Sequence, residues 1–368
     1  MRDFEGFLPL ADTNDQLPNE KKAEESAAIS PNSVLTLPTV TPRPSFYWPR
    51  EIKGLKKILL TKINILLFFI PFGILSWEFN SNALLTFAFN FIALVPLSSL
   101  LGAATEELAL HTGEIAGGLL NASFGNAVEM IMAFQALRKG LIVVVQGTLL
   151  GSILSNLLLV LGTSFFVGGL RHHVQKFNEK GATCSTSLLF LASFSISIPT
   201  LGKAAIENGV EKEHPSIGWV TGVLLLLVIT IVIAFISEFL VSSIDPLISN
   251  YNINTDFIGV ILLPIVGNAA EHLTAVTVAA KNKVDLTIGV AIGSSAQVAL
   301  LVVPFTVISG WIIGQEMTLA FPVLSALALI LSVIVVTGIV QDGESNWLEG
   351  VMLVMAYLLV AVLFWYYK

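Results

Sequence analysis

Charged residues are scarce in this chain. Only 12% of its 368 residues are Asp, Glu, Lys or Arg, whereas 54% are hydrophobic, and the mean hydropathy is +0.81. A composition this apolar excludes an ordinary soluble globular protein and is typical of a chain that crosses a membrane several times. The net charge of −7 owes much to the N-terminal region, and no nucleic-acid partner is expected.

Several chemical motifs are also missing. The single cysteine, Cys184, excludes an internal disulfide framework. The sequence has no Gly-x-x-x-x-Gly-Lys-(Ser/Thr) loop, which argues against an ATP-driven pump. Thiolate and imidazole clusters that would hold zinc or copper are absent. Since no Ser/His/Asp or metal-hydrolase constellation is present either, we expect neither an enzyme nor a bound cofactor.

Long apolar runs fill the chain after a polar N-terminal tail. Residues 1–50 lack the apolar core of a secretory signal and are expected to be disordered. A membrane-spanning helix needs about 20 apolar residues. Ten segments meet that condition: 58–77, 83–110, 114–137, 141–168, 184–203, 217–243, 256–280, 284–309, 317–340 and 346–366. The sequence therefore predicts an all-α polytopic membrane protein in a lipid bilayer.

Two stretches of the chain are copies of each other. Residues 125–162 and 267–304 align without a gap at an offset of 142, and 12 of the 38 positions are identical. We therefore divide the chain into a leading transmembrane helix at 51–82 and two homologous helix repeats at 83–203 and 217–368. A duplicated helix pair with an acid inside each copy is typical of secondary transporters, whose substrate site lies between repeats.

The repeated acids are Glu129 and Glu271. An ionisable side chain inside a membrane span is costly unless it faces protein, water or an ion. Asn126 and Asn268 come three residues earlier and share a helix face with the acids. Carboxylate and amide oxygens suit a hard divalent cation such as Ca²⁺. We therefore expect these four residues to bind the cation.

The same carboxylates predict proton coupling. A cation favours their ionised form, whereas burial favours their protonated form, so the site can hold a divalent cation or protons but not both. Gly125 and Gly267 should let the backbone open beside the acids, so that a carbonyl also points inward. The alternative is a pair of protonated glutamates buried in helix packing.

Two further acids lie on the helices that precede the copies. Glu106 and Glu238 are interpreted as a symmetric pair that relays protons or lines the access path. The alternative is a pair of interfacial carboxylates near helix ends. Glu107 is expected to be solvated.

Polar residues near the acids are also assigned to the pathway. We expect Ser152, Ser294 and Gln297 to line it from the second helix of each copy, although small hydroxyls also occur where membrane helices simply pack closely. His272 adjoins Glu271 and can modulate its charge, the alternative being a packing residue.

The basic residues predict the orientation of the chain. Arg50, Lys53, Lys56 and Lys57 precede the first span, and a second basic loop runs from 171 to 180, so both should face the cytoplasm. Strict alternation of the ten spans then gives both repeats the same direction and places Lys281 and Lys283 on the other side. An inverted arrangement needs one more crossing, for which residues 204–216 are too short and polar.

Four motifs resemble the calcium/proton exchangers of the cation/calcium exchanger superfamily. They are the repeated Gly-Asn-Ala-(Val/Ala)-Glu, LLGAATEELA at 100–109, LLGSILSN at 149–156 and LPIVGNAAEH at 263–272. The resemblance implies eleven helices, one leading helix and two inverted sets of five, and calcium export from the cytosol driven by protons. It makes Glu129 and Glu271 the central ligands and places Glu106, Glu238 and His272 along the pathway.

The resemblance also implies a setting for the protein. In eukaryotic members the usual site is the vacuolar membrane, and a prokaryotic member would lie in the plasma membrane. Mn²⁺ or other divalent cations are sometimes carried, the tail can be autoinhibitory, and a homo-oligomer is one arrangement to expect.

The chain departs from the family pattern between about 203 and 217. The sixth family helix and an acidic cytoplasmic segment are missing there, which leaves ten helices instead of eleven. Two alternatives to a calcium/proton antiporter therefore stay open: a sodium-coupled calcium exchanger, and a non-transporting truncated or regulatory form.

Overall fold

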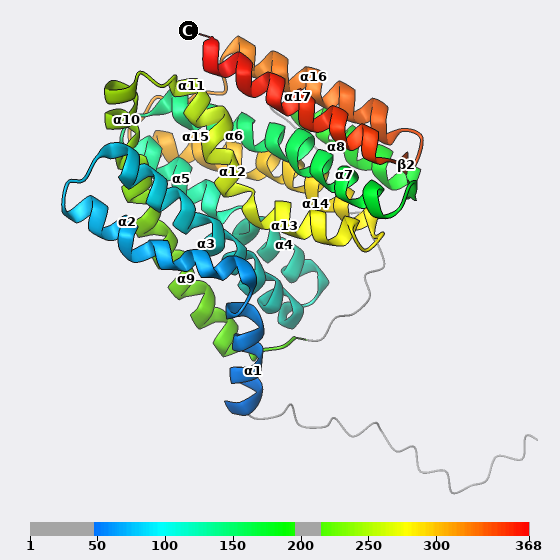
Figure 1. Ribbon diagram of the computed structural model, residues 1–368, viewed down its shortest axis with the longest axis horizontal. Coiled ribbons are helices and arrows are strands. Elements are labelled where there is room, and N and C mark those ends of the chain that lie inside the picture. The colour runs from blue at the N-terminus through cyan, green and yellow to red at the C-terminus, as the bar shows by residue number, and fades with distance from the viewer. Residues whose placement is uncertain (1–47, 196–214, 368) are drawn as a thin grey trace, which may run out of the picture. The chain divides into compact units, whose positions relative to one another are not determined.

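The structure is a computed structural model that describes residues 48–195 and 215–367 (Figure 1). The predicted tail, residues 1–50, lies outside the described residues except for its last three, which begin a helix. The first half contains α1 (Trp48–Leu59), η2 (Lys62–Phe68), α2 (Phe69–Glu78), α3 (Ala83–Thr112), α4 (Glu114–Gly125), α5 (Ala127–Arg138), α6 (Ile142–Leu154), η3 (Ser155–Val160), α7 (Leu161–Arg171), β1 (Gln175–Lys176) and α8 (Glu179–Ser195).

The second half repeats much of this order. It contains α9 (Trp219–Ser242), α10 (Ile244–Tyr251), α11 (Thr255–Phe257), η4 (Ile258–Leu262), α12 (Leu263–Gly267), α13 (Ala269–Ala279), α14 (Val284–Gln297), η5 (Val298–Val302), α15 (Val303–Ile312), α16 (Val323–Val340), β2 (Glu344–Ser345) and α17 (Trp347–Tyr366). The prediction of an all-α polytopic membrane protein is confirmed, apart from the short antiparallel pair β1–β2.

Helices lie at all ten predicted positions, but they are not all continuous spans. Within the described residues, six helices are long and apolar enough to cross a membrane, and two bent pairs raise the number to eight. One bent pair is α1 with η2–α2, at 81°, and the other is α11–α12 with α13, at 58°. The predicted span 114–137 is likewise divided into α4 and α5, and residues 196–203 of the span 184–203 lie outside the described part.

The two repeats run in opposite directions. His111, near the end of α3, has its Nε2 atom 2.7 Å from the carbonyl oxygen of Ile217, just before α9. The Tyr251 hydroxyl, which follows α9 at the end of α10, donates to Oδ1 of Asn82, the N-cap of α3. Because α3 opens the first repeat and α9 opens the second, the repeats are inverted.

Nine of the twelve lysines and arginines among the described residues lie at one end of the bundle, which we call the basic end (residues 50–57, 171–180 and 281–283). Gln175 Nε2 donates to the carbonyl oxygen of Ala279 and to Oδ1 of Asn282, at 3.0 and 2.9 Å. Lys281 and Lys283 therefore lie at the same end as the loop at 171–180, which agrees with the inverted arrangement and not with strict alternation of the ten predicted spans. Strict alternation counts no additional span in the connection between α8 and Pro215. That connection falls outside the described residues.

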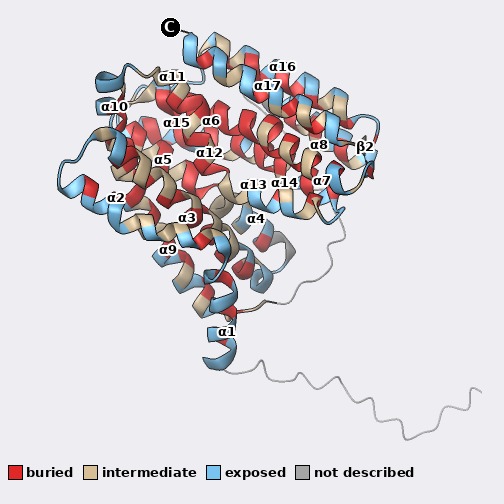
Figure 2. Ribbon diagram, viewed as in Figure 1, coloured by how far each residue is buried: buried red, intermediate tan, exposed pale blue. Residues whose placement is uncertain are grey.

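The buried core surrounds α6 and η3 (Figure 2). Every residue of α6 from Val144 to Leu154 is buried, whereas the outward faces of α9, α16 and α17 are largely apolar and exposed, as expected for surfaces in contact with lipid. Gly151 permits a close approach of two helices in this core, because a Cβ atom there would collide with the carbonyl oxygen of Val260 in η4. The site described next lies beside this contact.

Candidate functional site

Two breaks in the helices position the repeated acids. Asn126 separates α4 from α5, and Asn268 separates α12 from α13, with non-helical φ/ψ values of −102°/18° and −84°/15°. The predicted opening is therefore real, but it falls on the asparagines, and the two glycines are the last helical residues before it. Glu129 and Glu271 become the third residues of α5 and α13, where the helix dipole favours an anion and where half-helices of transporters face the substrate.

Glu129 is enclosed at the boundary between the repeats. Its side chain is 1% exposed, and neither carboxylate oxygen has a hydrogen-bond partner within the described part of the chain. A Cβ atom on Gly267 would lie 2.8 Å from Glu129 Oε1. The acid of the first repeat thus rests directly against the helix break of the second.

Glu271 lies nearby but is less enclosed. The residue is half-buried, and its Oε2 atom is buried without a partner among the described residues. The negative charge of Glu129 acts on Glu271, so the two carboxylates repel each other when both are ionised. Two carboxylates that repel each other and carry buried oxygens without described partners can be neutralised by a divalent cation or by protons.

Each asparagine at a break bonds to the other repeat. Asn126 Nδ2 donates to Gln297 Oε1 at 2.9 Å, which leaves the Asn126 Oδ1 atom without a described partner. Asn268 Nδ2 donates to the carbonyl oxygen of Ser152 at 2.9 Å, and the Ser152 hydroxyl donates to Asn268 Oδ1 at 2.7 Å. Gln297 and Ser152 therefore lie beside the asparagines of the predicted cation site.

Ser294 is hydrogen-bonded to Asn156, a residue that the predicted site does not include. Asn156 Nδ2 donates to Ser294 Oγ at 3.1 Å, and the Asn156 Oδ1 atom is buried with no partner in the described residues. Asn156 is fully buried, and a buried amide inside an apolar run was the sequence signal that could have identified it. Ser155, its neighbour, also has a buried hydroxyl without a described partner.

Matching irregular turns follow the serines in both repeats. The π-helical segments η3 and η5 occupy residues 155–160 and 298–302, which nearly coincide at the repeat offset of 142. Such segments are frequent at functional sites because they redirect side chains within a helix. They support the placement of the site between the two copies.

The oxygens available to a cation come from several elements. Buried oxygens without a described partner occur on Glu129, Glu271, Asn126, Asn156 and Ser155. No group of three or more His, Cys, Asp and Glu side chains that could hold a metal occurs within residues 48–195 and 215–367. The unpartnered oxygens thus include those of two carboxylates, the type of ligand that hard cations prefer.

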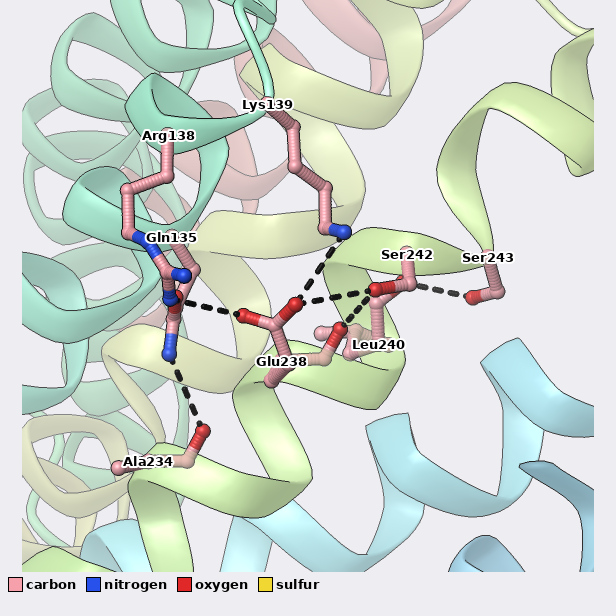
Figure 3. A network of polar contacts seen from close by, with 8 residues as sticks. All are labelled: Gln135, Arg138, Lys139, Ala234, Glu238, Leu240, Ser242 and Ser243. Atoms are coloured by element: carbon pink, nitrogen blue, oxygen red, sulfur yellow. Dashed lines mark hydrogen bonds and ion pairs between the residues drawn. The ribbon is translucent and has the colours of Figure 1, made fainter. Parts of the chain in front are cut away.

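Glu238 lies in an ion-pair cluster at the end of α5 (Figure 3). Lys139 Nζ is 3.2 Å from Glu238 Oε1, and Arg138 Nη1 is 3.6 Å from Oε2. Arg138 also donates to Gln135 Oε1 at 2.9 Å. The cluster joins the end of α5 to α9, at the end of the bundle opposite the basic end, so the structure does not bring Glu238 and Glu106 together.

Glu106 lines a cavity at the basic end together with Lys57, Ser99 and Ser216. Glu107 is buried, and its carboxylate accepts hydrogen bonds from the backbone nitrogen and the hydroxyl of Ser216, both at 2.6 Å. The expectation that Glu107 is solvated is wrong. The contact joins residues 109 positions apart, which no local pattern reveals.

His272 extends the site toward α7. Its Nε2 atom lies 2.9 Å from Thr163 Oγ1, and the histidine is half-buried. The structure therefore places a polar partner beside the residue that follows Glu271. Thr163 was not identified from the sequence, since a threonine in an apolar helix carries no signal of its own.

Comparison with known proteins gives consistent matches. The sodium/calcium exchanger protein family matches residues 82–228 and again 221–366. The vacuolar calcium ion transporter of Schizosaccharomyces pombe is 38% identical over 85% of this chain and 87% of its own length. The Ca²⁺/H⁺ antiporter of Aphanothece halophytica is 38% identical over 82% of this chain and 95% of its own length. The structure of native YfkE has a TM-score of 0.73 at 34% identity and covers 82% of this chain and 99% of its own.

Proposed function

This chain belongs to the sodium/calcium exchanger protein family, and from that premise we propose that it is a secondary-active antiporter that exchanges cytosolic Ca²⁺ for protons. It is an integral membrane transporter rather than an enzyme. One observation carries the proposal: Glu129 and Glu271, equivalent acids of two inverted repeats, lie close together with buried oxygens that have no described partner.

The mechanism is competition for one site. Ca²⁺ would bind the two carboxylates with the amide oxygens of Asn126 and Asn268 beside them, because hard cations take six or more oxygen ligands and water can complete the set. Protons would neutralise the same carboxylates when the cation leaves. Since two buried, ionised and uncompensated carboxylates are costly, the empty and ionised site is disfavoured, which couples the two ions.

The charge distribution supports the direction of transport. The basic end would face the cytoplasm by the positive-inside rule, so the Glu106 cavity opens on the cytosolic side. The name of the S. pombe relative supports a vacuolar membrane in a eukaryotic cell, and the plasma membrane is the site we propose for a prokaryotic one. An oxygen site of this kind would also accept Mn²⁺.

Sodium coupling is the second candidate. Its support is the family description itself, which names sodium, whereas the relatives at 38% identity include one named for protons. Replacing external sodium by choline during calcium uptake separates the two. Proton coupling predicts no change, and sodium coupling predicts loss of transport.

The missing crossing bears on whether the chain transports. The alignment with the S. pombe transporter extends over 357 positions but covers 85% of 368 residues, about 313 residues of this chain. The relative therefore has residues in the aligned region that this chain lacks. We propose that these residues correspond to the sixth helix and the acidic segment. Their loss is the observation that favours the alternative candidate, a non-transporting form.

Calcium uptake into sealed vesicles carrying this chain tests the proposal. An imposed inside-acid gradient should drive uptake, and Glu129→Gln and Glu271→Gln should each abolish it. The exposed Glu316 provides the matched control, since Glu316→Gln removes a carboxylate far from both breaks and should leave uptake unchanged. Absence of uptake by the correctly inserted parent chain would contradict the antiporter and favour the non-transporting form.

A further inference from the structure

A polar contact between the repeats holds the ring of His272. The histidine follows Glu271 in the first turn of α13, and its Nε2 atom is 2.9 Å from the Thr163 hydroxyl of α7. The residue next to a proposed ligand is thus fixed by a side chain 109 positions away. This contact has no part in the mechanism described above.

The direction of the hydrogen bond follows from the other contacts of Thr163. Its single hydroxyl proton is directed to the carbonyl oxygen of Leu159, at 2.7 Å, with that of Val160 at 3.1 Å. A threonine hydroxyl has one proton to donate and two lone pairs to accept with. Thr163 must therefore accept from His272, so Nε2 carries the hydrogen and donates it.

Thr163 is a rigid acceptor. Its side chain is branched at Cβ, and its bond to a carbonyl four residues earlier leaves one rotamer. The helix that carries it packs along both α13 and α17. If the His272 ring moves relative to α7, its hydrogen bond to Thr163 breaks, because the threonine hydroxyl cannot follow the ring.

The first repeat has no equivalent contact. At the repeat offset of 142, His272 corresponds to Met130 and Thr163 corresponds to Phe305. An apolar pair cannot form this hydrogen bond. The hydrogen bond between His272 and Thr163 therefore acts beside Glu271 and has no counterpart beside Glu129.

We propose that Thr163 is a positioning residue for the cation site: by accepting from His272 Nε2 it holds the first turn of α13 and thereby the Glu271 carboxylate. The inference rests on the proposed function for its ligand, Ca²⁺, but not on transport itself. Thr163 does not touch the cation, so its effect must pass through His272.

The experiment is a double-mutant cycle on the full chain. Two quantities are measured. The first is the Ca²⁺ concentration that gives half-maximal uptake under an inside-acid gradient, and the second is the Ca²⁺ concentration that gives half-maximal thermal stabilisation of the chain in detergent. Thr163→Val, His272→Ala and the double variant form the cycle, with Thr163→Ser as the conservative variant. Thr306→Val is the matched control, because the buried Thr306 hydroxyl donates only to the carbonyl oxygen of Val302.

Thr163→Val should raise both Ca²⁺ concentrations about three- to tenfold, the effect of one lost hydrogen bond. Thr163→Ser and Thr306→Val should stay within about twofold of the parent, and Thr163→Val should add nothing to His272→Ala.

Two results would overturn the proposal. One is that Thr163→Val weakens Ca²⁺ binding as much in the His272→Ala background as in the parent, and the other is that Thr163→Val is indistinguishable from Thr306→Val. Thr163→Ala replaces the valine variant if that one fails to fold. A parent chain without uptake would contradict the antiporter alone, since the thermal series still decides on Thr163.

Discussion

The two repeats place the same carboxylate in different surroundings. Glu129 is 1% exposed and lies against the helix break at Gly267, whereas Glu271 is half-buried and is followed by a histidine that hydrogen-bonds to Thr163. The break before Glu129 is bonded to Gln297, and the break before Glu271 is bonded twice to Ser152. Equivalent acids in a duplicated sequence therefore need not behave alike.

The difference arises from the partners and not from the repeated motif. Gly-Asn-Ala-x-Glu builds the same local structure twice, an asparagine at a break and an acid in the first turn of the next helix. The side chains that meet this structure come from the other repeat, and two of them differ from their equivalents at the offset of 142: Gln297 corresponds to Ser155, and Thr163 to Phe305. The motif is therefore the same in both repeats, whereas the side chains around it differ.

Among the substitutions that compare the two repeats, the glycines that end α4 and α12 should show the largest difference. A Cβ atom on Gly267 would lie 2.8 Å from Glu129 Oε1, whereas one on Gly125 would meet only Asn121 Oδ1 at 3.7 Å. Gly267→Ala should therefore displace Glu129 and weaken Ca²⁺ affinity about 10- to 100-fold. Gly125→Ala should stay within about threefold. Equal losses of Ca²⁺-dependent uptake in the two variants would show that the surroundings are symmetric after all.

The second glycine pair should differ in stability. A Cβ atom on Gly151 would collide with the Val260 carbonyl oxygen, whereas nothing lies within 4 Å of one on Gly293. Gly151→Ala should lower the melting temperature in detergent, at a cost of about 1–3 kcal/mol for overpacking, and Gly293→Ala should leave it unchanged. A melting temperature preserved in Gly151→Ala would contradict the close packing of α6 on η4.

The ion-pair cluster at Glu238 should give the smallest effect. It ties the end of α5 to α9, and the partly exposed side chains limit its strength. Glu238→Lys should reduce uptake about two- to fivefold, and adding Lys139→Glu should restore it. Lys139→Glu alone is the reciprocal control. If the charge-swapped double variant is no better than Glu238→Lys, the carboxylate itself is needed, as a proton relay would require.

The sequence predicts the local parts of this site well and the long-range parts poorly. Apolar length locates the helices, and the duplicated acids identify Glu129 and Glu271, because both signals are contained within about 40 residues. The burial of Glu107 under Ser216 and the contact of Thr163 with His272 each join positions 109 residues apart. Counting apolar runs leaves the direction of the second repeat open, and the contacts of α3 with α9 and α10 decide it.

Proton release on Ca²⁺ binding is the measurement that tests the central claim most directly. Calorimetric titration of the detergent-solubilised chain with Ca²⁺, in buffers of different ionisation enthalpy, counts the protons displaced. Competition for one pair of carboxylates predicts that Ca²⁺ binding releases protons, that lower pH weakens the binding, and that Glu129→Gln with Glu271→Gln eliminates both effects. Ca²⁺ binding of the same strength at every pH, with no proton released, would contradict the account.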